Sequence, residues 1–170
     1  MPKCSKDLVR SVRVRRALPA DIPAMMFLEQ ESSTAAHWSQ GQYQSALATS
    51  DPLSERVGWV AEVHEQPGIP SEVPALLGFL VAHRIDREWE LENIAVSATA
   101  RRGGVGTSLL SVFLEHVYAE NGSAIFLEVR ESNQSARGFY SKIGFEESGV
   151  RKSYYGDPAE DAILYRRRIS

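Results

Sequence analysis

One short segment of the chain combines arginines and glycines in a way that suits phosphate binding. It lies between an expected strand that ends at Val96 and a long expected helix, and it runs Arg101-Arg102-Gly103-Gly104-Val105-Gly106-Thr107. Glycines let a ligand approach the backbone, free N–H groups at a helix N-terminus attract anions, and arginines add charge-assisted hydrogen bonds. The spacing of the P-loop and that of the dinucleotide-binding motif are both missing. The segment favours another kind of phosphate site, with a glycine-rich connection that binds nothing as the alternative.

Two side chains further along the chain could transfer protons. Glu128 interrupts the apolar run Ala124–Val129, which we expect to form a strand covered on both faces. A carboxylate there costs free energy unless it is paired or used, so a general base and an ion pair with an arginine such as Arg130 are equal interpretations. Tyr140 lies on the apolar side of a short expected helix, where a core aromatic is the simpler interpretation.

A sheet with helices on it must position these residues. In the first half, alternating apolar and polar residues predict strands over 12–18, 57–63, 75–85 and 90–96. Asp21 and Ser39 are expected to cap two helices that precede the last three of these strands. The first half should therefore contain two helices and an antiparallel meander.

The second half alternates between strand and helix patterns. Apolar residues at helical spacing predict a long helix from about Val105 to Asn121, and Asn133 or Ser132 should cap a shorter helix that Gly144 closes. Strands are expected over 124–129, 145–155 and 162–169. This alternation predicts a mixed α/β sheet.

Length and composition restrict the class of protein. The chain has 170 residues, a typical length for one domain, and its formal charge of −3 argues against nucleic acid as the main ligand. No segment has the pattern of a secretory signal or a membrane span, so we expect a cytoplasmic protein. Its single cysteine, Cys4, cannot form an internal disulfide, and its four histidines lack metal-binding spacing, so we predict no metal.

Several ordered blocks resemble the GNAT superfamily of acyl-CoA-dependent N-acyltransferases. The Arg101-x-x-Gly104-x-Gly106 motif is similar to the family's [Q/R]-x-x-G-x-[G/A] signature. The chain is most similar to the RimI-like enzymes, which acetylate the N-terminal alanine of a ribosomal protein. The blocks that carry this closer resemblance are Asn93-Ile94-Ala95-Val96, Leu127-Glu128-Val129-Arg130-x-Ser132-Asn133, Phe139-Tyr140-x-x-x-Gly144-Phe145 and Arg151-x-x-Tyr154-Tyr155 with Glu160-Asp161-Ala162.

The resemblance implies a role for each of these positions. Glu128 falls where the family keeps its general base and Tyr140 where it keeps its general acid, while Glu90 and Glu92 are rival bases because some relatives use that strand. The acceptor side would be formed by Trp38, Glu92, Tyr154 and Tyr155. Acetyl-CoA would be bound by Ile94, Ala95, Val96, Arg101, Arg102, Gly103, Gly104, Val105, Gly106, Thr107 and Asn133.

The resemblance also implies a fold and a reaction. Residues 1–170 should form a single GNAT-like domain with a mixed, mostly antiparallel sheet of six or seven strands and about four helices, with 1–11 as a flexible extension. The expected reaction is direct transfer of acetyl from acetyl-CoA to a protein N-terminal amine, a ribosomal protein being one acceptor, within a ternary complex that releases coenzyme A. The alternatives are acetylation of a small amine or a lysine side chain, and a non-catalytic acyl-CoA-binding module.

Overall fold

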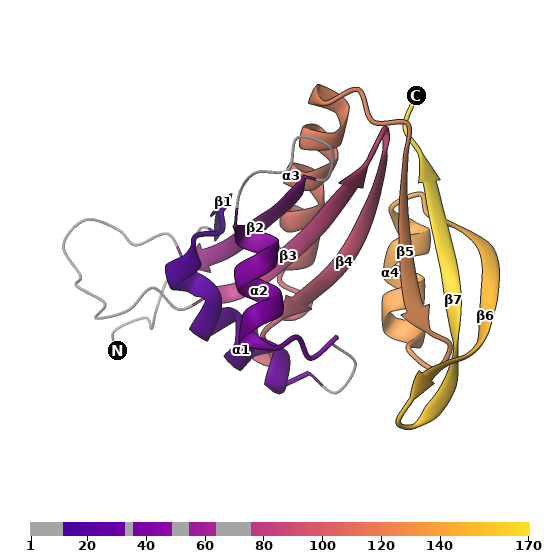
Figure 1. Ribbon diagram of the computed structural model, residues 1–170, viewed down its shortest axis with the longest axis horizontal. Coiled ribbons are helices and arrows are strands. Elements are labelled where there is room, and N and C mark those ends of the chain that lie inside the picture. Colours follow the sequence, from indigo (N-terminus) through magenta and orange to yellow (C-terminus); the bar gives the residue numbers. More distant parts are fainter. Residues whose placement is uncertain (1–11, 33–35, 49–54, 64–75) are drawn as a thin grey trace, which may run out of the picture.

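A computed structural model of the chain describes residues 12–32, 36–48, 55–63 and 76–170 (Figure 1). The expected extension over 1–11 lies outside the described residues.

The described residues form a sheet of seven strands in the order β1-β2-β3-β4-β5-β7-β6. Neighbouring strands are antiparallel except for β4 and β5, which are parallel. The strands are β1 (Val12–Arg16), β2 (Arg56–Val63), β3 (Leu76–Ile85), β4 (Glu88–Val96), β5 (Ala124–Arg130), β6 (Glu146–Gly156) and β7 (Ala159–Arg168).

Helices cover the two faces of this sheet unequally. α1 and α2 pack on one face of the N-terminal strands, while α3 and α4 pack on the opposite face, α3 against the N-terminal strands and α4 against the C-terminal ones (Figure 1). The α-helices are α1 (Ile22–Gln30), α2 (Gln40–Leu47), α3 (Val105–Ala119) and α4 (Gln134–Lys142), and the 3-10 helices are η1 (Pro19–Asp21) and η2 (Ala98–Ala100). The predicted mixed, mostly antiparallel sheet of six or seven strands with about four helices is confirmed.

The sheet opens between β4 and β5. These strands pair only where Glu88–Glu90 of β4 lies beside Ala124–Phe126 of β5, and beyond that point they diverge (Figure 1). Over the rest of the described length of both strands, the two facing edges have no ladder partner. Unpaired edges present backbone N–H and C=O groups, which a ligand can use.

A β-bulge in β4 lies next to this opening. In the register with β3, Val81 pairs with Asn93 and Ala82 pairs with Leu91, so Glu92 is an extra residue. The bulge reverses the alternation of side chains. Leu91 packs in the cluster under α3, whereas Ala95 packs in the cluster under α1 and α2. As a result, the side chains at the end of β4 that face α3 are those of Ile94 and Val96.

The structure confirms two of the expected helix caps. The Ser39 Oγ accepts a hydrogen bond from the Gln42 N–H of α2 at 3.3 Å, and the Asn133 Oδ1 accepts one from the Ala136 N–H of α4 at 3.1 Å. Both helix starts therefore satisfy one of their free N–H groups through a side chain.

Two local expectations are wrong. Asp21 occupies the N-cap position of α1 as expected, but its side chain does not bond the helix N–H groups, because its carboxylate accepts hydrogen bonds from the Leu18 N–H and from the Arg15 guanidinium, both at 2.8 Å. β5 is not covered on both faces. Its side chains at Phe126, Glu128 and Arg130 are partly exposed, since α3 and α4 cover only the opposite face. In the part of the chain described, no helix is long and apolar enough to cross a membrane.

Candidate active site

A cleft of about 720 Å³ lies where the end of β4, the start of α3 and α4 meet. Its walls come from the open strand edge on one side and from two helices on the other. The residues that line it are Ser32, Ile94, Ala95, Val96, Ala100, Arg101, Arg102, Gly104, Val105, Gly106, Thr107, Asn133, Gln134, Ser135, Ala136, Gly138, Phe139, Tyr140 and Lys142.

The start of α3 points free N–H groups at this cleft. Gly104 is the N-cap with φ +81°, and because it has no side chain it gives the helix no side-chain cap. The Ser108 N–H bonds to the Gly104 carbonyl at 2.9 Å, so the N–H groups of the three preceding residues have no partner within the helix. An uncapped helix start with a positive dipole end favours a bound anion.

Gly106 keeps the cleft open between α3 and α4. A Cβ added at this position would lie 3.4 Å from Cζ of Phe139 and 3.8 Å from Cγ2 of Val96. Any larger side chain would project into the same space. The glycine therefore leaves room for a ligand to lie against the backbone.

All of the predicted coenzyme residues line the cleft except Gly103. Gly103 instead forms the turn before α3: its N–H donates to the Ala100 carbonyl at 3.2 Å, and a Cβ there would approach that oxygen to 3.1 Å. Arg101 lines the cleft and also holds its edge, because its Nε donates to the Val96 carbonyl at 3.3 Å. Phe139, Ser32 and Lys142 line the cleft as well, although no role in the site was predicted for them.

Tyr140 combines a packed ring with a place in the cleft wall. Its ring lies 5.6 Å from that of Phe145 and 6.3 Å from that of Tyr165, between ring centres. Burial raises the pKa of Tyr140, so the phenol keeps its proton at neutral pH. The residue is thus both a core aromatic and a potential proton donor.

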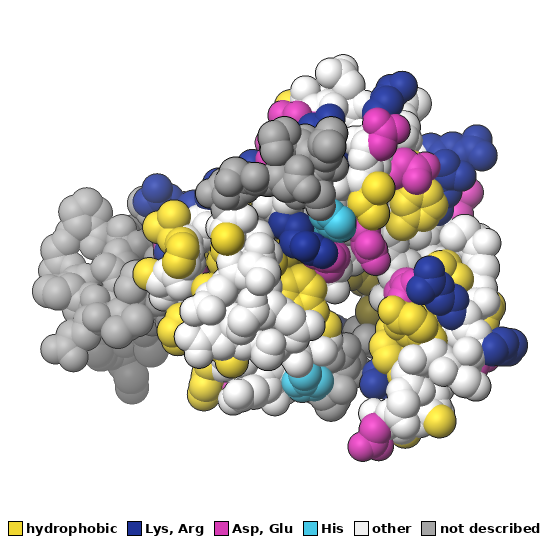
Figure 2. Space-filling model, viewed as in Figure 1, with side chains coloured by type: hydrophobic (Ala, Val, Ile, Leu, Met, Phe, Trp, Pro, Cys, Tyr) yellow, Lys and Arg dark blue, Asp and Glu magenta, His cyan; other side chains and the backbone are white. Residues whose placement is uncertain are grey.

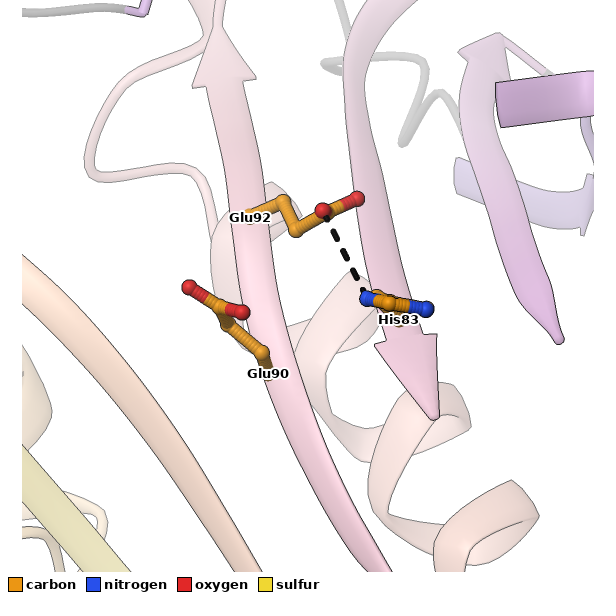
Figure 3. Close-up of side chains that lie close together, drawn as sticks. All are labelled: His83, Glu90 and Glu92. Carbon is orange, nitrogen blue, oxygen red and sulfur yellow. Dashed lines mark ion pairs between the residues drawn. The ribbon is translucent and has the colours of Figure 1, made fainter. Parts of the chain in front are cut away.

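On the other face of the sheet, acidic side chains gather beside the opening. Figure 2 shows a hollow on this face, between the part that carries α1 and α2 and the part that carries β6 and β7. Glu90, Glu92 and His83 lie close together there, with one donor atom of each within 4.8 Å of the others (Figure 3). This donor set resembles a metal site, but the Arg56 guanidinium already donates to both Glu92 oxygens, at 3.0 to 3.3 Å. We therefore assign no metal to it.

Glu90 differs from the other carboxylates of this group. Glu92 pairs with Arg56 at 3.0 Å and Glu128 pairs with Arg151 at 3.0 Å, whereas in the described part of the chain Glu90 has no ion pair. Burial raises the pKa of Glu90, and the neighbouring negative charges of Glu92 and Glu128 raise it further. A half-buried carboxylate with a raised pKa is a candidate proton acceptor.

Glu128 lies in an ion pair on the uncovered face of β5. Its partner is Arg151 of β6, at 3.0 Å, and not Arg130, which pairs with Glu160 at 3.3 Å. Hydrogen bonding to Glu128 is also the main cause of a raised pKa at Tyr154. The expected ion pair with an arginine is therefore present, with a partner that the sequence pattern did not identify.

The remaining residues predicted for the acceptor side, Trp38, Tyr154 and Tyr155, do not line the cleft. The rings of Tyr154 and Tyr155 are 5.2 Å apart near the end of β6. Trp38 lies before α2 with its ring 5.3 Å from that of Tyr43, and its backbone N–H donates to the buried Glu29 carboxylate at 2.9 Å. The predicted coenzyme residues other than Gly103, together with Tyr140, thus line the cleft, which we call the coenzyme side, and the residues predicted for the acceptor, which we call the acceptor side, lie outside it.

Comparison with known proteins identifies similar acetyltransferases. The family model for the acetyltransferase (GNAT) family matches residues 23–145. The ribosomal protein bS18-alanine N-acetyltransferase of Haemophilus influenzae is 39% identical over 92 residues, which are 52% of this chain and 62% of that protein. The N-alpha-acetyltransferase of Sulfurisphaera tokodaii is 30% identical over 164 residues, covering 93% of this chain and 85% of that protein.

A solved structure has the same arrangement of elements. The crystal structure of the ribosomal-protein-S18-alanine N-acetyltransferase from Escherichia coli matches with a TM-score of 0.73 and 27% identity, over 94% of this chain and 95% of that one. In sequence, however, the chain spans only 23%, 62% and 66% of three of the curated relatives it matches. The family model covers well over half of the chain and the Sulfurisphaera tokodaii relative aligns along most of it, so the chain belongs to the acetyltransferase (GNAT) family.

Proposed function

We propose that the chain is an acetyl-CoA-dependent N-acetyltransferase whose acceptor is the α-amine of a protein N-terminus, with the N-terminal alanine of a ribosomal protein as the first acceptor to test. The observation that carries the proposal is the cleft itself. It combines an uncapped helix start, an open strand edge and the buried Tyr140. The names of the relatives support the choice of acceptor.

The residues of the cleft fit the parts of acetyl-CoA. Acetyl-CoA supplies a thioester, whose acyl carbon is the electrophile. The N–H groups at the start of α3 and the guanidinium groups of Arg101 and Arg102 would hold the pyrophosphate. The open edge at Ile94–Val96 would hydrogen-bond the amide-containing arm, and Asn133 lies on the opposite wall.

The acceptor amine needs a base on the other side of the opening. An α-amine has a pKa of about 7.7 to 8.0, so much of it is protonated near neutral pH and cannot attack. Glu90 and Glu128 are the two candidates to take that proton. Glu90 is supported by its raised pKa and by the lack of an ion pair to any residue that the structure describes, whereas protonation of Glu128 would break its pair with Arg151.

The remaining steps use the strand edge and Tyr140. The amine nitrogen forms a bond to the acyl carbon while backbone N–H groups at the open edge of β4 stabilise the negative charge on the carbonyl oxygen. The nitrogen then loses its second proton to solvent. The carbon–sulfur bond then breaks, and Tyr140 gives its hydroxyl proton to the leaving sulfur. Tyr140 regains a proton from solvent, and the products are an acetylated amine and coenzyme A. No covalent enzyme intermediate is needed.

An acceptor panel tests this function. The protein is incubated with acetyl-CoA and peptides that differ only in their first residue, beside lysine peptides with a blocked N-terminus and small polyamines. We expect thiol release above the enzyme-free rate with free N-terminal peptides. Faster thiol release with polyamines or lysine peptides would show that a small amine or a lysine side chain is the acceptor instead. Both are cations, which the acidic group around Glu90 would also attract. Coenzyme binding without thiol release for any acceptor would indicate a non-catalytic binding module.

A further inference from the structure

Glu29, in the last turn of α1, is a carboxylate buried beneath the acceptor side. Only 1% of the residue is exposed. It accepts hydrogen bonds from the Trp38 backbone N–H at 2.9 Å, the Tyr43 hydroxyl at 2.8 Å and the Asn93 side-chain amide at 2.7 Å. All three donors are neutral groups, and within the described ranges of the chain no cation pairs with this carboxylate. Burying it in this way is costly for a group with no purpose beyond packing.

The three donors come from three different elements. Trp38 precedes α2, Tyr43 lies within α2, and Asn93 lies in β4. Tyr43 closes the network, because its hydroxyl donates to Glu29 and accepts from the Asn93 amide at 3.1 Å. Burial and the bond to Glu29 raise the pKa of Tyr43, which keeps its proton in place for this bond. One carboxylate therefore fixes α1, α2 and β4 relative to one another.

Asn93, which the Glu29 network holds, lies directly before the strand residues that line the cleft. Asn93 follows the bulge at Glu92, and the next residues, Ile94 to Val96, form the open strand edge. On the other end of the network, α1 leads directly to Ser32, whose N–H donates to the Glu29 carbonyl at 3.0 Å and which lines the cleft. The Glu29 network thus connects the loop of Trp38 on the acceptor side with the strand edge on the coenzyme side.

We infer that Glu29 is a positioning residue. It fixes the loop that carries Trp38 relative to the open edge of β4, so that the acceptor amine is held within reach of the acyl carbon. The inference rests on the proposed function, and it adds a residue that touches neither substrate. A carboxylate is required because three donors share two acceptor oxygens. A glutamine would turn its own N–H₂ group toward one of these donors.

The first test compares Glu29→Gln with the wild type at a temperature well below unfolding of either protein. We expect kcat to fall at least about tenfold, because small displacements of reacting groups are costly. The dissociation constant of coenzyme A should stay within about twofold, since the helix start that would hold the pyrophosphate is not part of the network. The exchanged pair, Glu29→Gln with Asn93→Asp, places one carboxylate and one amide in the same space and should restore most of kcat, whereas Asn93→Asp alone should not.

Glu62→Gln is the matched control. Glu62 is also a buried carboxylate, 9% exposed, and it binds Arg15 at 3.0 Å near the far edge of the sheet. Its substitution should lower the melting temperature while leaving kcat unchanged. If Glu29→Gln behaves in the same way, with reduced stability and wild-type kcat, the network is merely structural and the inference is overturned.

A second readout does not depend on activity. The Trp38 N–H donates directly to Glu29, so its hydrogen exchange should become about tenfold faster or more in Glu29→Gln and stay unchanged in Glu62→Gln. Wild-type exchange in Glu29→Gln would show that the carboxylate does not hold the loop, which also overturns the inference. If the wild type acetylates no acceptor but exchange responds as expected, the proposed function fails while the mechanical link through Glu29 stands.

Discussion

The two sides of the candidate site are built in different ways. The coenzyme side is formed mainly by two short stretches of chain, 94–107 and 133–142, and it offers backbone N–H groups, glycines and a strand edge. The acceptor side is formed by Trp38, which precedes α2, and by side chains from β2, β3, β4, β5 and β6, several of which are held in ion pairs. Backbone groups, as on the coenzyme side, suit a ligand that does not vary. Side chains, as on the acceptor side, allow single substitutions to change which acceptor is bound.

The two sides also differ in their charge. The coenzyme side adds Arg101, Arg102 and Lys142 to a positive helix end. On the acceptor side, the charges of Glu92 and Glu128 are offset by arginines, whereas Glu90 has no ion pair among the described residues. Substitutions on one side should therefore change coenzyme affinity, and substitutions on the other should change the handling of the acceptor.

The largest effect is expected for Tyr140→Phe, which keeps the ring but removes the proton donor. We expect kcat to fall about 100-fold, a typical contribution of general acid catalysis. Coenzyme affinity should change less than twofold, because the ring still packs against Phe145 and Tyr165. Thiol release and calorimetric titration with coenzyme A measure the two quantities. Unchanged turnover would remove Tyr140 from the reaction.

The next comparison sets Glu90→Gln against Glu128→Gln. If Glu90 is the base, Glu90→Gln should lower kcat by about 10-fold to 100-fold, and Glu128→Gln should have a smaller effect. The pKa of Glu90 is raised by burial and nearby carboxylates, and the base must be unprotonated. The wild-type rate should therefore fall as the pH drops through that raised pKa, and Glu90→Gln should lose this limb of the pH–rate profile. Loss of the limb in Glu128→Gln instead would reverse the assignment.

A smaller effect, confined to coenzyme binding, is expected for Gly104→Ala. The added methyl group meets no atom within 4 Å, but the backbone at φ +81° is unfavourable for alanine by roughly 1 kcal/mol. Relaxation of this residue would move the free N–H groups of α3, so the dissociation constant of coenzyme A should rise about fivefold. Gly41→Ala is the control, since Gly41 lies in α2 with equally open space and no positive φ. Equal affinities for both variants would contradict the role of the helix start.

The smallest effect is expected for the pH dependence of stability, which comes from His116 and is distinct from the pH dependence of the rate that comes from Glu90. His116 lies between the rings of Trp59 and Trp89, and burial lowers its pKa below the ordinary value of 6.5. The unfolded chain then binds more protons, so stability should fall as the pH drops below about 6.5. We expect His116→Phe to lose a few degrees less in melting temperature than the wild type between pH 7.5 and 5.5. Parallel melting curves for both proteins would contradict this.

The sequence predicts the coenzyme side better than the acceptor side, and the reason is physical. The positions of Gly104, Asn133 and Tyr140 follow from local rules for helix starts, caps and helical periodicity, and the structure places them along the expected elements. Arg56 reaches Glu92 across 36 positions in the sequence, and Glu29 reaches Asn93 across 64. Such pairs depend on strand order and register, which local patterns do not specify.

The two wrong expectations have the same origin. Asp21 has the right type and spacing for a helix cap, but an arginine on a neighbouring strand offers stronger, charge-assisted hydrogen bonds. The apolar run of β5 is typical of a strand covered on both faces, yet α3 and α4 cover only one face and α1 and α2 lie over other strands. In both cases the outcome depends on tertiary packing, which the local spacing of residues does not predict.

The most direct test of the central claim locates the transferred acetyl group. A peptide that carries both a free N-terminal alanine and an internal lysine is incubated with the protein and acetyl-CoA, and fragment mass spectra identify the modified nitrogen. We predict acetylation of the α-amine, with Tyr140→Phe giving the same product much more slowly. Acetylation of the lysine alone, or a product that forms equally fast with Tyr140→Phe and wild type, would contradict the account.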